Sequence, residues 1–97
     1  MEKYVKRMIL EHKELNEKIE KLATYIYIDL NKPDGVEKDS KEEYGDKKSQ
    51  IDAMVNYRNC LLSRLARVGV DYDPLSKEYT EVINTNELKN NTKDNPN

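Results

Sequence analysis

Residues 51–68, IDAMVNYRNCLLSRLARV, decide the fold because their apolar side chains recur with the spacing of a helix. One apolar stripe comprises Ile51, Met54, Leu61, Leu65 and Val68. A second stripe beside it comprises Ile51, Val55, Leu62 and Ala66. A helix that packs against one neighbour needs an apolar arc of only about 100°. Because the two stripes together are wider than that, the sequence predicts that this helix packs between two neighbours.

An upstream helix is predicted from about Glu2 to Asp29 by an unbroken heptad pattern of apolar residues. The members of this seam are Val5, Met8, His12, Leu15, Ile19, Leu22 and Ile26. The segment NKPDG at residues 31–35 should end the helix, because proline interrupts a helix and Asp-Gly favours a turn. Two long helices joined by one loop predict an antiparallel hairpin.

The ends of the downstream helix carry recognisable capping signals. Ser40 followed by Glu43 is a capping box, in which the cap contributes about 1 kcal/mol to helix stability. Gly69 stands directly after the apolar pattern and is expected to adopt the left-handed conformation that closes many helices. The helix should therefore run from Ser40 to Val68, with looser first turns because Lys47 and Lys48 make them polar.

The chain changes character after Gly69. Residues 71–75, DYDPL, predict a turn, and Ser76 is a candidate cap for a short helix that extends through Ile83. The β-branched content of residues 79–83 is equally compatible with a short strand. Residues 84–97 are rich in asparagine and almost without apolar side chains, so they are expected to be a disordered tail. The predicted organisation is an all-α hairpin domain over residues 1–83, with a short C-terminal element and this tail.

The composition favours assembly over an independent monomer. Hydrophobic residues make up 36% of the 97-residue chain and charged residues 37%, and a short chain this polar buries little core alone. Small chains with little core commonly gain stability by oligomerisation, so a homo-oligomeric helical bundle is expected. The net charge of -2 gives no drive toward duplex nucleic acid or a membrane. The absence of a long apolar run and the single cysteine, Cys60, indicate a cytoplasmic protein.

Candidate catalytic groups are few. His12 occupies a seam position and, if the hairpin is symmetric about its loop, faces Arg58, so the two are expected to form a register-fixing polar layer. A ligand-binding role for His12 is the alternative. Cys60 has no second cysteine or neighbouring histidine with which to form a metal site or a thiol nucleophile. The sequence predicts no enzyme, no metal site and no cofactor.

Basic and aromatic residues gather at the open end of the predicted hairpin, opposite the loop. The candidate ligand-binding residues are Lys3, Tyr4, Arg7, Tyr57, Arg64 and Arg67. Arginine forks bind phosphate in a bidentate manner, lysines add charge, and tyrosine rings stack on bases. The alternative is that Arg64 and Arg67 only offset the negative end of the helix dipole.

Residues of both helices also follow the spacing of a group of phage proteins. In the first helix they are Arg7, Glu11, Leu15, Lys18, Ile19, Leu22, Tyr25 and Ile26. In the second helix they are Met54, Tyr57, Leu61, Arg64 and Leu65. Over residues 4–68 the chain resembles small helical-hairpin proteins of tailed bacteriophages, including crAss-like phages. Its architecture is similar to that of phage anti-defence sponges, which oligomerise and sequester cyclic nucleotide signals of host immunity without cleaving them.

One departure limits what this resemblance implies. The best-known sponges of this type carry Gly-Tyr-Arg at the start of the first helix, whereas this chain has Lys3, Tyr4 and Val5 there. Their ligand residues therefore do not transfer by motif, and the resemblance supports fold and assembly more than it supports the ligand.

Two functions from different classes follow. The first is an oligomeric phage sponge in the host cytoplasm that captures a cyclic nucleotide between protomers. The second is a helical hairpin that binds a host or phage protein through its surplus apolar stripe, with no small ligand.

Overall fold

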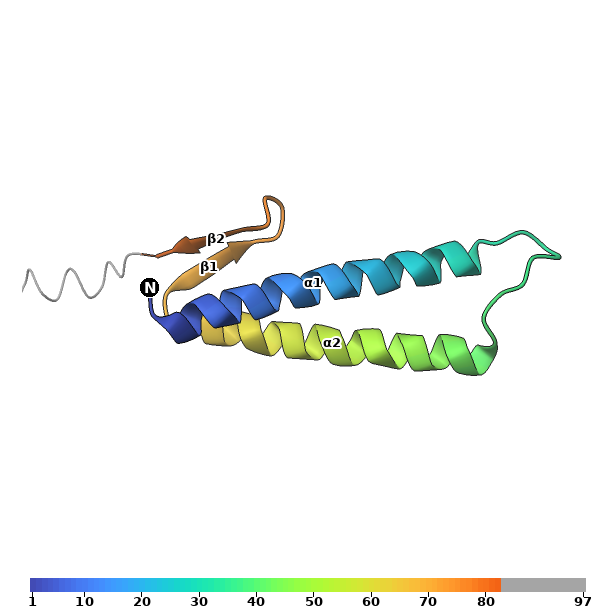
Figure 1. Cartoon of the computed structure of the whole chain (residues 1–97), viewed down its shortest axis with the longest axis horizontal. Coiled ribbons are helices and arrows are strands. Elements are labelled where there is room, and N and C mark those ends of the chain that lie inside the picture. The colour runs from blue at the N-terminus through green and yellow to red at the C-terminus, as the bar shows by residue number, and fades with distance from the viewer. Residues whose placement is uncertain (83–97) are drawn as a thin grey trace, which may run out of the picture.

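A computed structural model describes residues 1–82 and shows a two-helix hairpin followed by a small β-hairpin (Figure 1). Helix α1 spans Lys3–Leu30 and helix α2 spans Lys41–Arg67. Strands β1 (Val70–Asp73) and β2 (Glu78–Glu81) follow as one antiparallel sheet. The α-helices lie side by side, and the β-hairpin folds back along the half of α1 that contains the N-terminus. The predicted helical hairpin is confirmed, with each helix boundary within a residue of its predicted position.

The core lies between the two helices and beneath β1. Its buried members are Val5, Met8, Leu15, Ile19, Leu61, Leu65 and Val70. Leu61 and Leu65 are fully buried and are the only buried residues of α2. The predicted seam of α1 is confirmed, since six of its seven members are buried and Leu22 is half-buried. The core is therefore concentrated in the open half of the hairpin.

The prediction that Val68 belongs to the buried apolar stripe of α2 is wrong. Val68 is 39% exposed because α2 ends at Arg67 and Val68 is its C-terminal cap. Gly69 follows with φ +83°, the left-handed conformation that the sequence predicted for it. The chain thereby reverses direction, and Val70 enters the core in place of Val68.

The N-terminal cap of α2 is confirmed atom by atom. The Glu43 backbone N–H donates to Ser40 Oγ at 3.1 Å, and the Ser40 N–H donates to Glu43 Oε1 at 3.0 Å. These reciprocal bonds satisfy backbone donors that a helix start otherwise leaves unpaired.

The segment after Gly69 is a β-hairpin, so the prediction of an all-α chain is wrong for this element. Residues 71–73 belong to β1 rather than to a turn, and no helix starts at Ser76. Tyr72 pairs with Tyr79 across the strands, and both rings are half-buried on the side that faces α1. The turn is closed by a bond from the Lys77 N–H to the Asp73 carbonyl at 2.7 Å. Alternate residues of these strands are buried only through their contact with α1, so the sequence of the strands alone does not reveal the pattern.

Two further expectations concern the C-terminal tail and membrane-spanning segments. The predicted tail at residues 84–97 lies outside the described residues. In the described part of the chain, neither helix combines the length and the continuous apolar sequence that a membrane span requires.

Replacing Leu61 with alanine should lower the free energy of unfolding by about 2–5 kcal/mol, because the side chain is fully buried and its loss leaves a cavity. Urea denaturation followed by circular dichroism measures this change. The matched control is Leu75→Ala in the β-hairpin turn, where leucine is 94% exposed and the change should stay within about 0.5 kcal/mol. Equal effects of the two substitutions would contradict the assigned core.

Candidate functional site

The predicted ligand-binding residues lie in the open half of the hairpin, where the start of α1 meets the end of α2 (Figure 1). All six side chains are exposed: Lys3, Tyr4, Arg7, Tyr57, Arg64 and Arg67. Among them, the Tyr57 hydroxyl donates a hydrogen bond to the Glu11 carboxylate. The antiparallel packing thus brings the basic residues of both helices to the same end of the molecule, and their role as ligand contacts stays a prediction.

Arg64 and Arg67 occupy the last turn of α2. Cations at this position stabilise a helix by interacting with its partial negative charge. That structural role and phosphate binding are compatible, because an exposed guanidinium that lies near the last carbonyls keeps donors free for a ligand.

A second polar cluster lies between the helices and the β-hairpin, and His12 is at its centre. The His12 ring is fully buried, and its Nδ1 lies 2.5 Å from the Tyr79 hydroxyl. The Tyr72 ring approaches edge-on, with ring centroids 4.6 Å apart. The two tyrosine rings also contact each other in a tilted arrangement, with centroids 4.8 Å apart, so the three aromatic rings are in mutual contact.

Asn16 and Arg58 complete this cluster. The Asn16 Nδ2 donates to the Tyr72 hydroxyl at 2.9 Å, and the Arg58 guanidinium makes a long bond of 3.4 Å to Asn16 Oδ1. His12 and Arg58 line the same cleft, as their predicted opposition across the hairpin requires. The structure adds Asn16, Tyr72 and Tyr79, which sequence reasoning did not assign to the layer.

We call this space the β-hairpin cleft, and its volume is about 340 Å³. Its polar lining consists of His12, Asn16, Glu20, Arg58, Tyr72 and Lys77. Lys77 in the β-hairpin turn pairs with Glu20 of α1 at 3.2 Å, and both side chains are well exposed. The ion pair therefore stands at the rim of the cleft, with Arg58 and His12 further inside.

The protonation states within the cleft follow from burial and charge. Desolvation, followed by the positive charge of Arg58, lowers the pKa of His12, so its imidazole is neutral at pH 7. Desolvation, followed by the neighbouring Tyr72, raises the pKa of Tyr79 to about 12, so its phenol keeps its proton. We assign the phenol as donor to Nδ1, which places the imidazole proton on Nε2.

Two buried donors in this cluster lack hydrogen-bond partners among the described residues: His12 Nε2 and Arg58 Nε. A buried donor without a partner destabilises a protein by about 1–3 kcal/mol, so native structures seldom leave two together. Both side chains that carry these donors line the β-hairpin cleft.

With this geometry established, comparison with protein families gives one match. The family model described as Sequestin matches residues 2–67, about two thirds of the chain. The chain belongs to the Sequestin family. Comparison with curated proteins and with solved structures finds no match.

The Sequestin match covers both helices and their loop and ends before β1. The family name denotes sequestration, which is a binding role and not a catalytic one. The name is compatible with the binding, non-enzymatic function that the sequence predicts.

A second hollow lies between α1 and α2 in the half of this Sequestin hairpin that is nearer the loop. This groove has a volume of about 530 Å³ and is lined by Lys18, Lys21, Leu22, Tyr25, Lys47, Gln50 and Met54. The Lys47 ammonium lies 4.4 Å from the centroid of the Tyr25 ring and 2.5 Å from the Asp39 carboxylate. Lys47 is thus already engaged in structural contacts, whereas Lys18 and Lys21 make no ion pair within the described residues.

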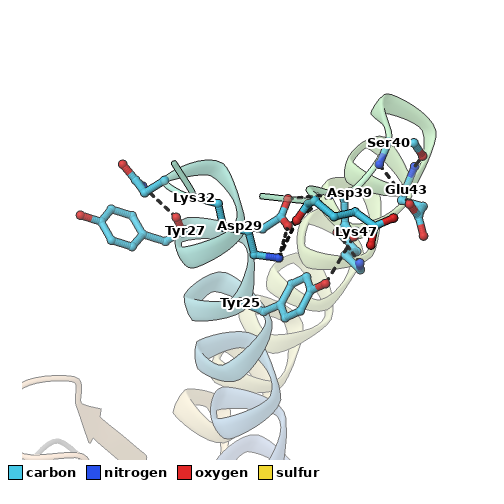
Figure 2. Close-up of polar contacts among 10 residues, drawn as sticks. Tyr25, Tyr27, Asp29, Lys32, Asp39, Ser40, Glu43 and Lys47 are labelled. Carbon is cyan, nitrogen blue, oxygen red and sulfur yellow. Dashed lines mark hydrogen bonds and ion pairs between the residues drawn. The ribbon is translucent and has the colours of Figure 1, made fainter. Parts of the chain in front are cut away.

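The same contacts anchor the loop between the helices (Figure 2). Asp29 is 4% exposed, and its carboxylate accepts hydrogen bonds from the Asp39 N–H and pairs with Lys32 at 3.1 Å. Burial alone would raise the pKa of Asp29, but the Asp39 N–H and the nearby lysines Lys32 and Lys47 together lower it. The loop half is therefore held together by a buried carboxylate and its donors.

Replacing Asp29 with asparagine should lower the melting temperature at pH 7, because the loop loses its charged acceptor. A lowered pKa in the folded state contributes stability above the ordinary value of 3.8 that is lost as pH falls through the folded value. The difference in melting temperature between wild type and Asp29→Asn should therefore shrink below about pH 4. Thermal denaturation between pH 2 and 8 measures it, with the exposed Asp34→Asn as control. A pH-independent difference would show that the charge of Asp29 is irrelevant.

Proposed function

We propose that this chain is a phage-encoded, non-enzymatic anti-defence protein that sequesters a nucleotide-type immune signal, in particular a cyclic nucleotide, in the host cytoplasm. Membership of the Sequestin family over both helices is the observation that carries the proposal. A protein that inhibits by sequestration needs a binding surface and a high copy number but no catalytic group. The described hairpin fits this requirement with exposed cations and aromatic rings at one end.

The open end supplies the chemistry for such a ligand. Arg64 and Arg67 offer planar forks to phosphate oxygens, and Lys3 and Arg7 add positive charge from the start of α1. Tyr4 and Tyr57 are each 45% exposed, so their rings are accessible for stacking on a base.

We propose further that two copies pack as a four-helix bundle and bind the ligand between protomers. Support comes from the second apolar stripe of α2. Ile51, Val55 and Leu62 are only half-buried within one chain, and Ala66 is exposed. A second hairpin that covers this stripe would remove it from water, as the composition of so polar a chain requires.

The substitution Ala66→Glu should dissociate the assembly, because it places a charge in the proposed interface while leaving the core of one chain untouched. Light scattering after gel filtration should give a dimer for wild type and a monomer for the variant. The matched control is Ala53→Glu, at an alanine that is also exposed but lies on another face of α2. A wild-type protein that is monomeric at micromolar concentration would refute the assembly.

The double substitution Arg64→Ala with Arg67→Ala should abolish ligand binding without unfolding the protein. Each charge-assisted hydrogen bond contributes about 1.5–3 kcal/mol, so losing both arginines should weaken affinity by roughly a hundredfold or more. A panel of cyclic mononucleotides and cyclic oligonucleotides, screened by thermal shift, measures this. A ligand at a hundred times its dissociation constant stabilises the protein by about 2.7 kcal/mol.

The matched control for that experiment is Lys41→Ala with Lys48→Ala, which removes two exposed charges from the loop half of α2. Binding should survive in this variant. If no nucleotide in the panel shifts the melting temperature, and none is released from the purified protein by heating, the sponge proposal is wrong. The protein-binding hairpin, which uses the same apolar stripe without a small ligand, then becomes the better proposal.

A further inference from the structure

The β-hairpin cleft is lined by two side chains that each carry a hydrogen-bond donor that the described fold itself does not use. His12 Nε2 and Arg58 Nε are both buried without a partner among residues 1–82, and both side chains line the cleft. His12 is held in a fixed orientation, because its other ring nitrogen is bonded to Tyr79 and its ring face is packed against Tyr72. A donor fixed in this way is organised before any ligand arrives.

We propose that the β-hairpin cleft is an anion subsite that holds a phosphate ester group of the sequestered molecule between Arg58 and His12. The inference rests on the proposed function for the class of ligand, and it places part of that ligand between His12 and Arg58, for which a ligand-binding role was only the alternative interpretation of the sequence. Arg58 provides the charge and the fork, and the neutral His12 provides a directed N–H donor.

The charge distribution in the cleft favours a phosphate over a cation. Glu20 is the one carboxylate in the lining, and it is paired with Lys77 at the rim. The Arg58 side chain is half-buried. Its hydrogen bond to the Asn16 amide oxygen is long, and that oxygen carries no formal charge that could neutralise the guanidinium. The inner cleft therefore carries a positive charge that no carboxylate neutralises among the lining residues.

The size of the cleft limits what enters it. A volume of about 340 Å³ lies at the lower end of the range for small-molecule sites, roughly 300–1,000 Å³. Such a space suits a phosphate with part of its sugar, while the remainder of a larger nucleotide stays outside. Tyr72 and Lys77 come from the β-hairpin, which follows the residues matched by the Sequestin model. This half of the subsite is therefore a feature of the present chain that the family match does not imply.

The single histidine of the chain makes the proposal directly testable by NMR. In protein labelled with ¹⁵N-histidine, the two imidazole nitrogens belong to His12 alone. The free protein at pH 7 should show a neutral ring with its proton on Nε2. Titration with inorganic phosphate, and with any nucleotide that the thermal-shift panel identifies, should shift Nε2 more than Nδ1 in a saturable manner.

The variant Arg58→Lys tests the planar guanidinium donors of Arg58 separately from its positive charge. It keeps a positive side chain but removes the Nε–H and the planar donors, so affinity should fall at least tenfold and the His12 shift should disappear at the same ligand concentration. The matched control is Lys48→Ala, which removes an exposed charge of α2 outside the cleft and should leave the His12 shift intact. Circular dichroism checks folding, and the wild-type titration decides the question even if Arg58→Lys unfolds.

The outcomes separate this inference from the proposed function. If a nucleotide binds and depends on Arg64 and Arg67 while the His12 signals stay unchanged, the sponge proposal stands and the cleft subsite is wrong. If no nucleotide binds but phosphate shifts Nε2 in an Arg58-dependent manner, the anion subsite stands and the nucleotide proposal is wrong. If neither phosphate nor nucleotide shifts the wild-type His12 signals, the inference is overturned.

Discussion

The burial of Leu61 and Leu65 against α1 is the interaction on which the rest of the structure depends. These are the only side chains of α2 that lose all contact with water, and they meet α1 near its open end. Val70 joins them directly after the left-handed turn at Gly69, so the same contact positions β1. With so few fully buried residues, the fold has little excess apolar stabilisation, and polar contacts must hold the remainder in place.

This division gives the two halves of the hairpin different properties. The open half is held by apolar packing and by the β-hairpin, whereas the loop half relies on the Asp29 carboxylate and the contacts of Lys47. Apolar packing leaves charged groups free for ligands, while Lys32 and Lys47 of the loop half are already paired with carboxylates. A binding site for an anion is therefore more favourable in the open half, where Arg58, Arg64 and Arg67 make no ion pair within the described residues.

The sequence was sufficient for most features that depend on local spacing, with Val68 as the exception. Heptad positions predicted the seam of α1, and short motifs predicted the Ser40 cap and the conformation of Gly69. The β-hairpin was undecided because four-residue strands carry too little periodicity, and its burial depends on contact with α1. The cleft was missed for the same reason: His12 and Tyr79 are 67 residues apart in the chain. Only the His12–Arg58 opposition, which follows from hairpin symmetry, was accessible beforehand.

The open end and the β-hairpin cleft differ in how they can act on one ligand. Exposed arginines and lysines attract an anion over distances up to the Debye length, about 8 Å at physiological salt, but each contact there is screened and immobilises a long side chain. His12 and Arg58 act over short range, yet the His12 ring is fully buried and already ordered, and Arg58 is half-buried. Screened charges mainly raise the association rate, and pre-organised donors mainly slow dissociation. Sequestration requires slow dissociation, because a captured signal that escapes is active again. Taken together, the two proposals assign capture of the ligand to the exposed arginines and slow release to the cleft, so that loss of either should weaken sequestration.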